Sequence, residues 1–186
     1  MPRKNKKSPK KASRLKKSVT KLTQTPAFDD RALRAHLVNC LDAETAHVNF
    51  DKTTGGWPEA TRGVKPAGSP HSAWQLLEHM RLGQWDILEF IVNPKHVSPP
   101  WPSGYWPATD APPSNEAWLK SIKNFQSDLQ KMRDLISNPK TDLFAKIPHG
   151  TGQTILRQVL LLADHNSHHL GQLVLLRRLL GAWPSQ

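Results

Sequence analysis

Four segments of the chain repeat their apolar residues every three to four positions, and this periodicity limits the fold more than any other feature. Such spacing places apolar side chains on one face of an α-helix. The segments run from about Asp29 to Val48, from Ser72 to Val92, from Ser114 to Asn138 and from Gln153 to Leu180. No segment alternates apolar and polar residues as a half-buried strand would. The sequence therefore predicts an all-α protein, with the four helices packed as a bundle.

Capping residues mark where these helices begin and end. Ser72 can accept hydrogen bonds from the first free N–H groups of the helix that follows it, and the third helix is predicted to start near Ser114 or Asn115. Asn93 and Asn138 each precede a proline, which disfavours helical backbone and ends the second and third helices. Gly181 suits the left-handed position that follows a helix.

Two long connections separate the predicted helices. Residues 49–70 contain glycines and prolines at positions that are typical of turns. Residues 99–113 combine prolines with Trp101, Tyr105 and Trp106. Because proline fixes φ, this second connection is predicted to hold one shape. Tyr105 and Trp106 are candidate pocket residues. Whether their loop covers a site or only packs against the helices stays open.

The positive charge of the chain is concentrated at its N-terminus. The formal net charge is +11, but residues 1–22 carry ten lysines and arginines and no acid, so the remainder is nearly neutral. A run of like charges with few apolar residues cannot bury enough surface to fold. Residues 1–25 are therefore predicted to form a disordered basic tail, with weak and salt-sensitive binding to polyanions. Residues 26–186 are predicted to form the helical domain.

Composition excludes several classes of protein. No stretch approaches the roughly 20 apolar residues that cross a bilayer, and the tail lacks the apolar core of a secretory signal. A cytoplasmic protein without membrane partners is therefore expected. The single cysteine, Cys40, excludes an internal disulfide and a cysteine-based zinc site. Its spacing from Leu37 and Leu41 predicts a thiol buried in the core.

Histidines interrupt the apolar faces of two predicted helices. His165 and His169 stand one helical turn apart, on the face that carries Leu162 and Leu176. His79 interrupts the apolar face of the second helix in the same way. Converging imidazoles would repel one another if protonated, whereas neutral imidazole is a good ligand for a divalent transition metal. The pattern predicts one ion held by His79, His165 and His169.

A hydrogen-bonded core cluster without metal is the alternative for these histidines. The glutamate of a zinc-peptidase HExxH helix is missing between His165 and His169, so a metallopeptidase is disfavoured. His168 is rotated by about 100° from His169 and is not predicted to be a ligand. His47 and His149, near predicted helix ends, are kept as candidate pocket residues.

Two motifs make the chain similar to a known family. The stretches His71-Ser-Ala-Trp-Gln-Leu-Leu-Glu-His79-Met and Asp164-His165-Asn-Ser-His168-His169-Leu-Gly-Gln172-Leu resemble the DinB-like superfamily, over residues 29–183. The segment His47-Val-Asn-Phe and the loop at Trp101 look like one branch of it. The resemblance implies a four-helix bundle of up-down-down-up topology, with a metal held by His79, His165 and His169. Gln172, within the second motif, joins the candidate pocket residues.

Three protein ligands leave a fourth position for water or substrate, which is typical of catalytic zinc. The leading hypothesis is a metal-dependent enzyme in which zinc or nickel activates a water or thiol nucleophile toward a small molecule, as an S-transferase or a hydrolase. The resemblance implies a low-molecular-weight thiol as co-substrate. One alternative is a non-catalytic, metal-stabilised binding or stress-response module, for which a homodimer is expected. The other is a protein that associates with polyanions through its tail.

Overall fold

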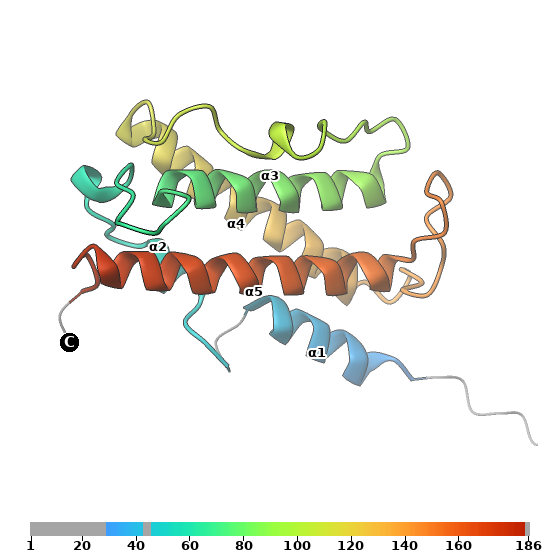
Figure 1. Cartoon of the computed structure of the whole chain (residues 1–186). Coiled ribbons are helices and arrows are strands. Elements are labelled where there is room, and N and C mark those ends of the chain that lie inside the picture. Colours follow the sequence, from blue (N-terminus) through green and yellow to red (C-terminus); the bar gives the residue numbers. More distant parts are fainter. Residues whose placement is uncertain (1–28, 43–45, 185–186) are drawn as a thin grey trace, which may run out of the picture.

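The computed structural model describes residues 29–42 and 46–184, and within these ranges the protein is helical (Figure 1). The helices are α1 (Arg31–Asp42), α2 (Phe50–Thr54), α3 (Ala73–Val92), α4 (Asn115–Ser137) and α5 (Ile155–Leu179), with two 3₁₀ turns, η1 (Glu59–Thr61) and η2 (Ser103–Tyr105). No strand occurs in the described ranges, where Lys146 and Thr154 form an isolated bridge. The all-α prediction is confirmed.

The predicted basic tail, residues 1–25, lies outside the described residues. Among the helices that are described, none is both long enough and apolar enough to cross a membrane.

Helix α3 begins at its predicted capping residue. The Ser72 side chain accepts a hydrogen bond from the Gln75 N–H, and the Gln75 side chain accepts one from the Ser72 N–H. This reciprocal pair satisfies two of the N–H groups that lack a partner within the helix. The Ser114 side chain caps α4 by accepting a hydrogen bond from the Ala117 N–H, and Gly181 follows α5 with a φ of 63°. The boundaries of α3 and α4 thus follow the sequence closely, while α5 begins after the cap Thr154 rather than at Gln153.

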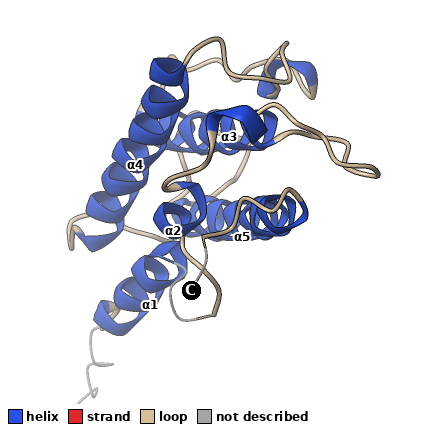
Figure 2. Ribbon diagram, turned by 90° about the vertical axis from the view of Figure 1, so that its left-hand side faces the viewer, coloured by secondary structure: helices blue, strands red, loops and turns tan. Residues whose placement is uncertain are grey.

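Helix α3 contacts both α4 and α5, and α1 contacts α4 and α5 in turn. Figure 1 shows α3 and α5 side by side and running in opposite directions. In Figure 2, α4 lies to one side of this pair and α1 beneath it. Leu77 and Met80 of α3, Phe125 and Met132 of α4, and Leu162 and Leu173 of α5 are buried in the shared core. The face of α5 that carries His165 and His169 is therefore directed toward α3.

The first helix is shorter than predicted, and Cys40 is not in the core. Helix α1 ends at Asp42, so Val48 lies outside it, and its buried residues are Arg34, Leu37 and Leu41. The Cys40 thiol is exposed. At 100° per residue, Cys40 points about 90° away from the centre of the buried stripe. The prediction of a core thiol is wrong, because a helix that buries one narrow stripe leaves its flanking apolar residues in solvent.

The connection at residues 49–70 contains α2 and η1 and is more regular than its glycines and prolines indicate. Arg177 of α5 is buried against it and donates hydrogen bonds to the backbone oxygens of Lys52, Thr53 and Gly55. The Arg177 guanidinium also lies over the ring of Trp57. One buried arginine thus holds this connection on the C-terminal half of α5.

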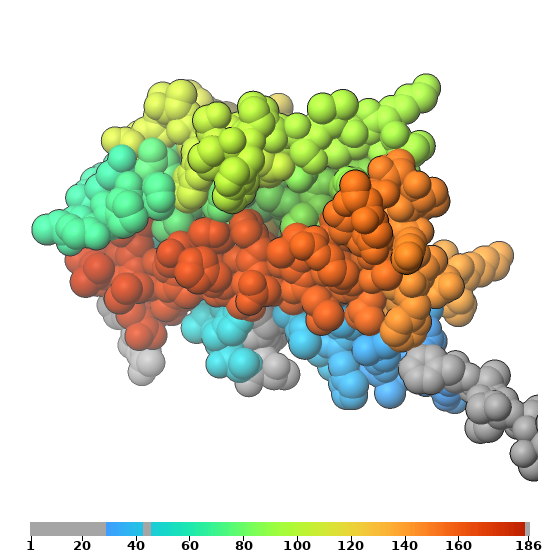
Figure 3. All heavy atoms as spheres, turned by 45° about the vertical axis from the view of Figure 1, so that its right-hand side comes forward, coloured from blue at the N-terminus to red at the C-terminus, as the bar shows by residue number. Residues whose placement is uncertain are grey.

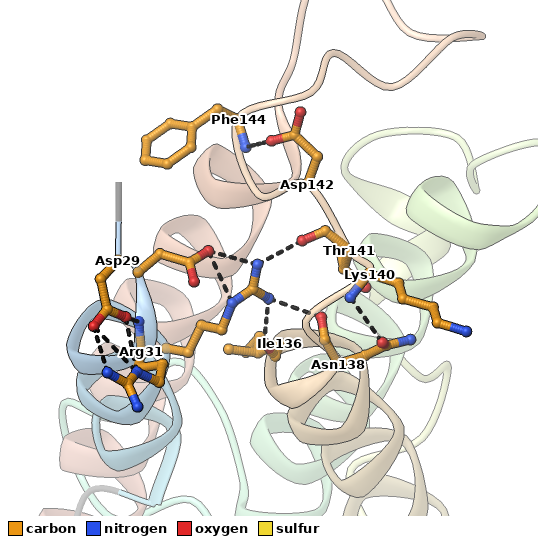
Figure 4. Close-up of polar contacts among 10 residues, drawn as sticks. Asp29, Arg31, Ile136, Asn138, Lys140, Thr141, Asp142 and Phe144 are labelled. Atoms are coloured by element: carbon orange, nitrogen blue, oxygen red, sulfur yellow. Dashed lines mark hydrogen bonds and ion pairs between the residues drawn. The ribbon is translucent and has the colours of Figure 1, made fainter. Parts of the chain in front are cut away.

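A second buried arginine joins α1 to the end of α4. The Arg34 side chain donates hydrogen bonds to the backbone oxygens of Ile136, Asn138 and Thr141 (Figure 4). The last carbonyls of a helix have no donor within it, so a guanidinium is a suitable partner. An ion pair with Asp30 holds the guanidinium in place. This contact fixes α1, which packs against the rest through only a few apolar side chains.

Candidate metal centre

Three imidazoles meet between α3 and α5. His79 comes from α3, His165 and His169 come from α5, and one ring nitrogen of each lies within 4.8 Å of the others. The Nε2 atoms of His79 and His165 are 3.2 Å apart. A tetrahedral zinc ion with Zn–N bonds of about 2.0–2.1 Å holds two ligand nitrogens about 3.3 Å apart. The donor atoms, and the spacing of the His79 and His165 nitrogens, therefore fit a divalent transition metal.

Hydrogen bonds set the tautomers of two of these rings. His79 Nδ1 donates to the backbone oxygen of Tyr105 at 3.1 Å, and His169 Nδ1 donates to Gln172 Oε1 at 2.7 Å. When Nδ1 carries the proton, Nε2 keeps the lone pair that binds a metal. Both rings are thus oriented with Nε2 available as a ligand.

A chain of amides lies behind the third imidazole. His165 Nδ1 is 3.4 Å from Asn166 Oδ1, and the Asn166 amide donates to Gln84 Oε1 at 3.0 Å. Gln84, which is fully buried, donates in turn to the backbone oxygen of Phe125. This chain ties α5 to α3 and α4 beside the centre. Gly83 completes the arrangement, because a Cβ at that position would lie 2.9 Å from His165 Cε1.

Burial keeps the three imidazoles neutral. The pKa of His79 and of His169 is lowered to about 4, mainly because burial desolvates the rings and also because neighbouring imidazoles disfavour a positive charge, while the bonds to Tyr105 and Gln172 act in the opposite direction. Desolvation also lowers the pKa of His165. Neutral imidazole is the form that coordinates metal, so the electrostatics of the site favour a cation over protons at neutral pH.

Trp106 is stacked between two imidazoles. The centroid of its ring lies 3.9 Å from that of the His79 ring, with an angle of 5° between the planes. On the other side, the centroid of the His71 ring lies 4.0 Å away, with an angle of 16° between the planes. It therefore covers one face of His79 and excludes water from it. Tyr105 and Trp106 of the proline-rich loop thus lie against the three histidines, whereas Trp101 is exposed.

A carboxylate holds this loop on α3. The Asp86 side chain accepts a hydrogen bond from the Tyr105 hydroxyl at 2.8 Å and another from His96 Nε2 at 2.7 Å. Burial and the Asp86 carboxylate raise the Tyr105 pKa to about 12. Because the Tyr105 carbonyl orients His79, Asp86 and His96 act on the centre through the loop.

The structure brings some of the candidate pocket residues to the three histidines and not others. Tyr105, Trp106 and Gln172 contact them. His47 lines a separate cavity of about 370 Å³ and lies 3.4 Å from Ser167 Oγ. His149 bonds to the backbone oxygen of Phe90, eleven residues beyond His79 and thus about 16 Å along α3. The sequence suggested both histidines only because they stand near helix ends, and neither contacts the three histidines.

Several residues at the centre have no role in the sequence-based prediction. His71 and Asp86 contact the loop at residues 101–106, and His96 contacts Asp86; the path of this loop cannot be derived from helical spacing. Of these three residues, only His71 could have been suspected from the sequence, because it opens the motif that contains His79. His168 is exposed and accepts from Gln172 Nε2 at 3.3 Å, which agrees with its exclusion from the predicted ligands.

Comparison with curated proteins and with solved structures gave no match. A family model of the DinB superfamily matches residues 42–173, a range that includes α3, α4 and the part of α5 that carries His165 and His169. Proteins of this superfamily bind metal, which agrees with the cluster of imidazoles. The match covers most of the chain, and the protein therefore belongs to the DinB superfamily.

Proposed function

We propose that the protein is a metal-dependent enzyme in which His79, His165 and His169 hold one divalent ion, zinc or nickel. The observation that carries this proposal is the convergence of three neutral imidazoles, two of which have their Nε2 atoms spaced as in a tetrahedral zinc site. Within the described residues, this group offers three ligands. A structural zinc site is normally closed by four protein ligands, so three favour an ion with a position for substrate.

A divalent ion bound there would supply Lewis acidity toward a water or thiol nucleophile. The chain itself orients the ligands and controls solvent. The Tyr105 carbonyl and Gln172 fix two rings, and Trp106 excludes water from one face of His79. These features support nucleophilic attack on a small electrophilic substrate, of the S-transferase or hydrolase type. The exposed thiol of Cys40 lies on α1, which carries none of these residues, so a thiol co-substrate would be external.

The proposal includes the bundle expected for the family. Helices α1, α3, α4 and α5 would be its four members, in up-down-down-up order. The contacts of α3 with α4 and α5, and of α1 with the same two helices, support this arrangement.

A screen of small thiols with electrophilic acceptors tests the enzymatic proposal, on protein loaded with zinc or nickel. Turnover is expected in the wild type and in Cys40→Ser, and it should disappear with the metal in His79→Ala. Turnover that requires Cys40 would contradict an external thiol. Metal that raises the unfolding temperature without any turnover, with thiols or with hydrolysable esters, would instead favour a non-catalytic, metal-stabilised module.

The basic tail supports a separate, additional activity. Residues 1–22 hold ten bases and no acid, a composition that binds polyanions through counterion release. Deletion of residues 1–22 should abolish salt-sensitive DNA binding and leave the metal content unchanged. DNA binding of equal strength in the shortened chain would show that another surface is responsible.

A further inference from the structure

A pocket of about 310 Å³ lies next to the candidate metal centre, between the C-terminal half of α5 and the segment that precedes α3. Figure 3 shows this segment lying against that half of α5. Two residues connect the pocket to the centre. Gln172 lines the pocket and bonds to His169, and His71 lines it and stacks on Trp106, which covers His79. The pocket therefore adjoins the centre through these two residues.

The wall of the pocket is uncharged. Leu76 of α3 and Leu175, Leu176 and Leu179 of α5 form its apolar side. None of the described residues that line it is an aspartate, glutamate, lysine or arginine. Burial, with Lys65 nearby, lowers the pKa of His71, so its ring is neutral at pH 7. A phosphate or carboxylate would lose its hydration here without gaining a charged partner in the wall, whereas an apolar group would gain by burial.

The pocket has a defined shape and an exposed apolar mouth. Ser69 Oγ donates to the backbone oxygen of His71 at 2.7 Å and Gly68 adopts a φ of 84°, so the turn that forms one wall is fixed. Leu175 and Leu179 remain 58% and 61% exposed at the opening. Clustered exposed leucines at a concave surface are typical of binding sites. The volume is at the lower end of that for small-molecule pockets, which suits one part of a ligand.

We propose that this pocket binds the apolar part of the substrate, an alkyl chain or a single ring, while the polar, reacting end of the same molecule lies at His79, His165 and His169. The inference rests on the proposed metal-dependent function. It narrows the substrate class to amphipathic small molecules and assigns Leu175, Leu176 and Leu179 to specificity.

Aliphatic hydroxamates of increasing chain length test the proposal. The hydroxamate group binds divalent metals, and the chain probes the pocket. Titration calorimetry of the zinc-loaded, full-length protein should show affinity rising by about fourfold for each added methylene, from acetohydroxamate toward octanohydroxamate, until the pocket is filled. Leu175→Asp should remove most of this gain. Leu160→Asp is the matched control, because Leu160 is another exposed leucine of α5 that does not line the pocket, and it should retain the gain.

The outcomes separate the pocket from the metal centre. If acetohydroxamate binds only with zinc but longer chains bind no more tightly, the pocket proposal is overturned and the metal centre stands. If the chain-length gain is equally large without zinc, the pocket binds apolar groups but the proposed link to the centre is wrong. If Leu175→Asp converts a dimer into monomers and keeps the chain-length gain, this face is a contact between copies of the chain, which also overturns the proposal.

Discussion

At Gly83, the absence of a single carbon atom determines how closely His165 approaches α3. A Cβ there would lie 2.9 Å from Cε1 and 3.2 Å from Nε2 of His165. A glycine inside a helix costs about 1 kcal/mol relative to alanine. The sequence thus places a residue that weakens α3 at the point where His165 must lie beside His79. Room for an imidazole explains a glycine that the helical pattern alone does not.

Gly83→Ala is expected to weaken metal binding by about tenfold or more, because the new methyl group displaces His165 from its position beside His79. Gly171→Ala is the control, since a methyl group added to this glycine of α5 would meet no described atom within 4 Å beyond the backbone of its own helix. It should gain helix stability and keep its metal affinity. Competition with a chelator of known affinity measures the metal affinity of both variants. Equal metal affinity in the two variants would contradict the role given to Gly83.

At the scale of helices, periodicity predicted α3, α4 and α5 almost to the residue, because each has a long apolar stripe, and the cap Ser72 marked the start of α3. The same periodicity placed three histidines on facing stripes. It failed for α1, where Cys40 lies beside a narrow stripe, and for residues 49–70, where Arg177 holds short helices in place. The orienting contacts of Tyr105 and Asp86 come from a loop, and loop paths depend on tertiary packing rather than local spacing.

Arg34 is a buried polar contact between α1 and the end of α4. Arg34→Met should lower the free energy of unfolding by about 3 kcal/mol, because it leaves buried carbonyls at the end of α4 without a donor. Arg31→Met, on the same helix, changes a side chain that is 87% exposed and paired with Asp29, and it should change stability by less than about 0.5 kcal/mol. Urea denaturation gives both values. An equally small loss of stability in the two variants would contradict the role given to Arg34.

For the molecule as a whole, the buried imidazoles couple folding to pH. The pKa of His79 and of His169 is about 4 in the folded protein, against an ordinary value of 6.5. Between these values the unfolded chain binds more protons than the folded one, so stability falls as pH falls. The stability that depends on neutral His79 and His169 is fully present above pH 6.5 and is lost progressively as the pH falls to about 4.

The metal-free protein should therefore show a decreasing unfolding temperature from pH 7 to pH 4.5. His79→Leu should flatten this dependence, because it removes one of the groups that must stay neutral in the fold. His36→Gln, a change of an exposed histidine of α1, should leave the slope as in the wild type. Calorimetry across this pH range measures the effect. An equally steep slope in His79→Leu would mean that other groups control acid stability.

The metal content of purified full-length protein tests the central claim most directly. After loading with zinc and removal of free ion, elemental analysis should find one ion per chain in the wild type and in His36→Ala. In His165→Ala, whose Nε2 lies 3.2 Å from that of His79 in the wild type, stoichiometric metal should be lost. One tightly held ion per chain in His165→Ala would contradict the three-histidine centre.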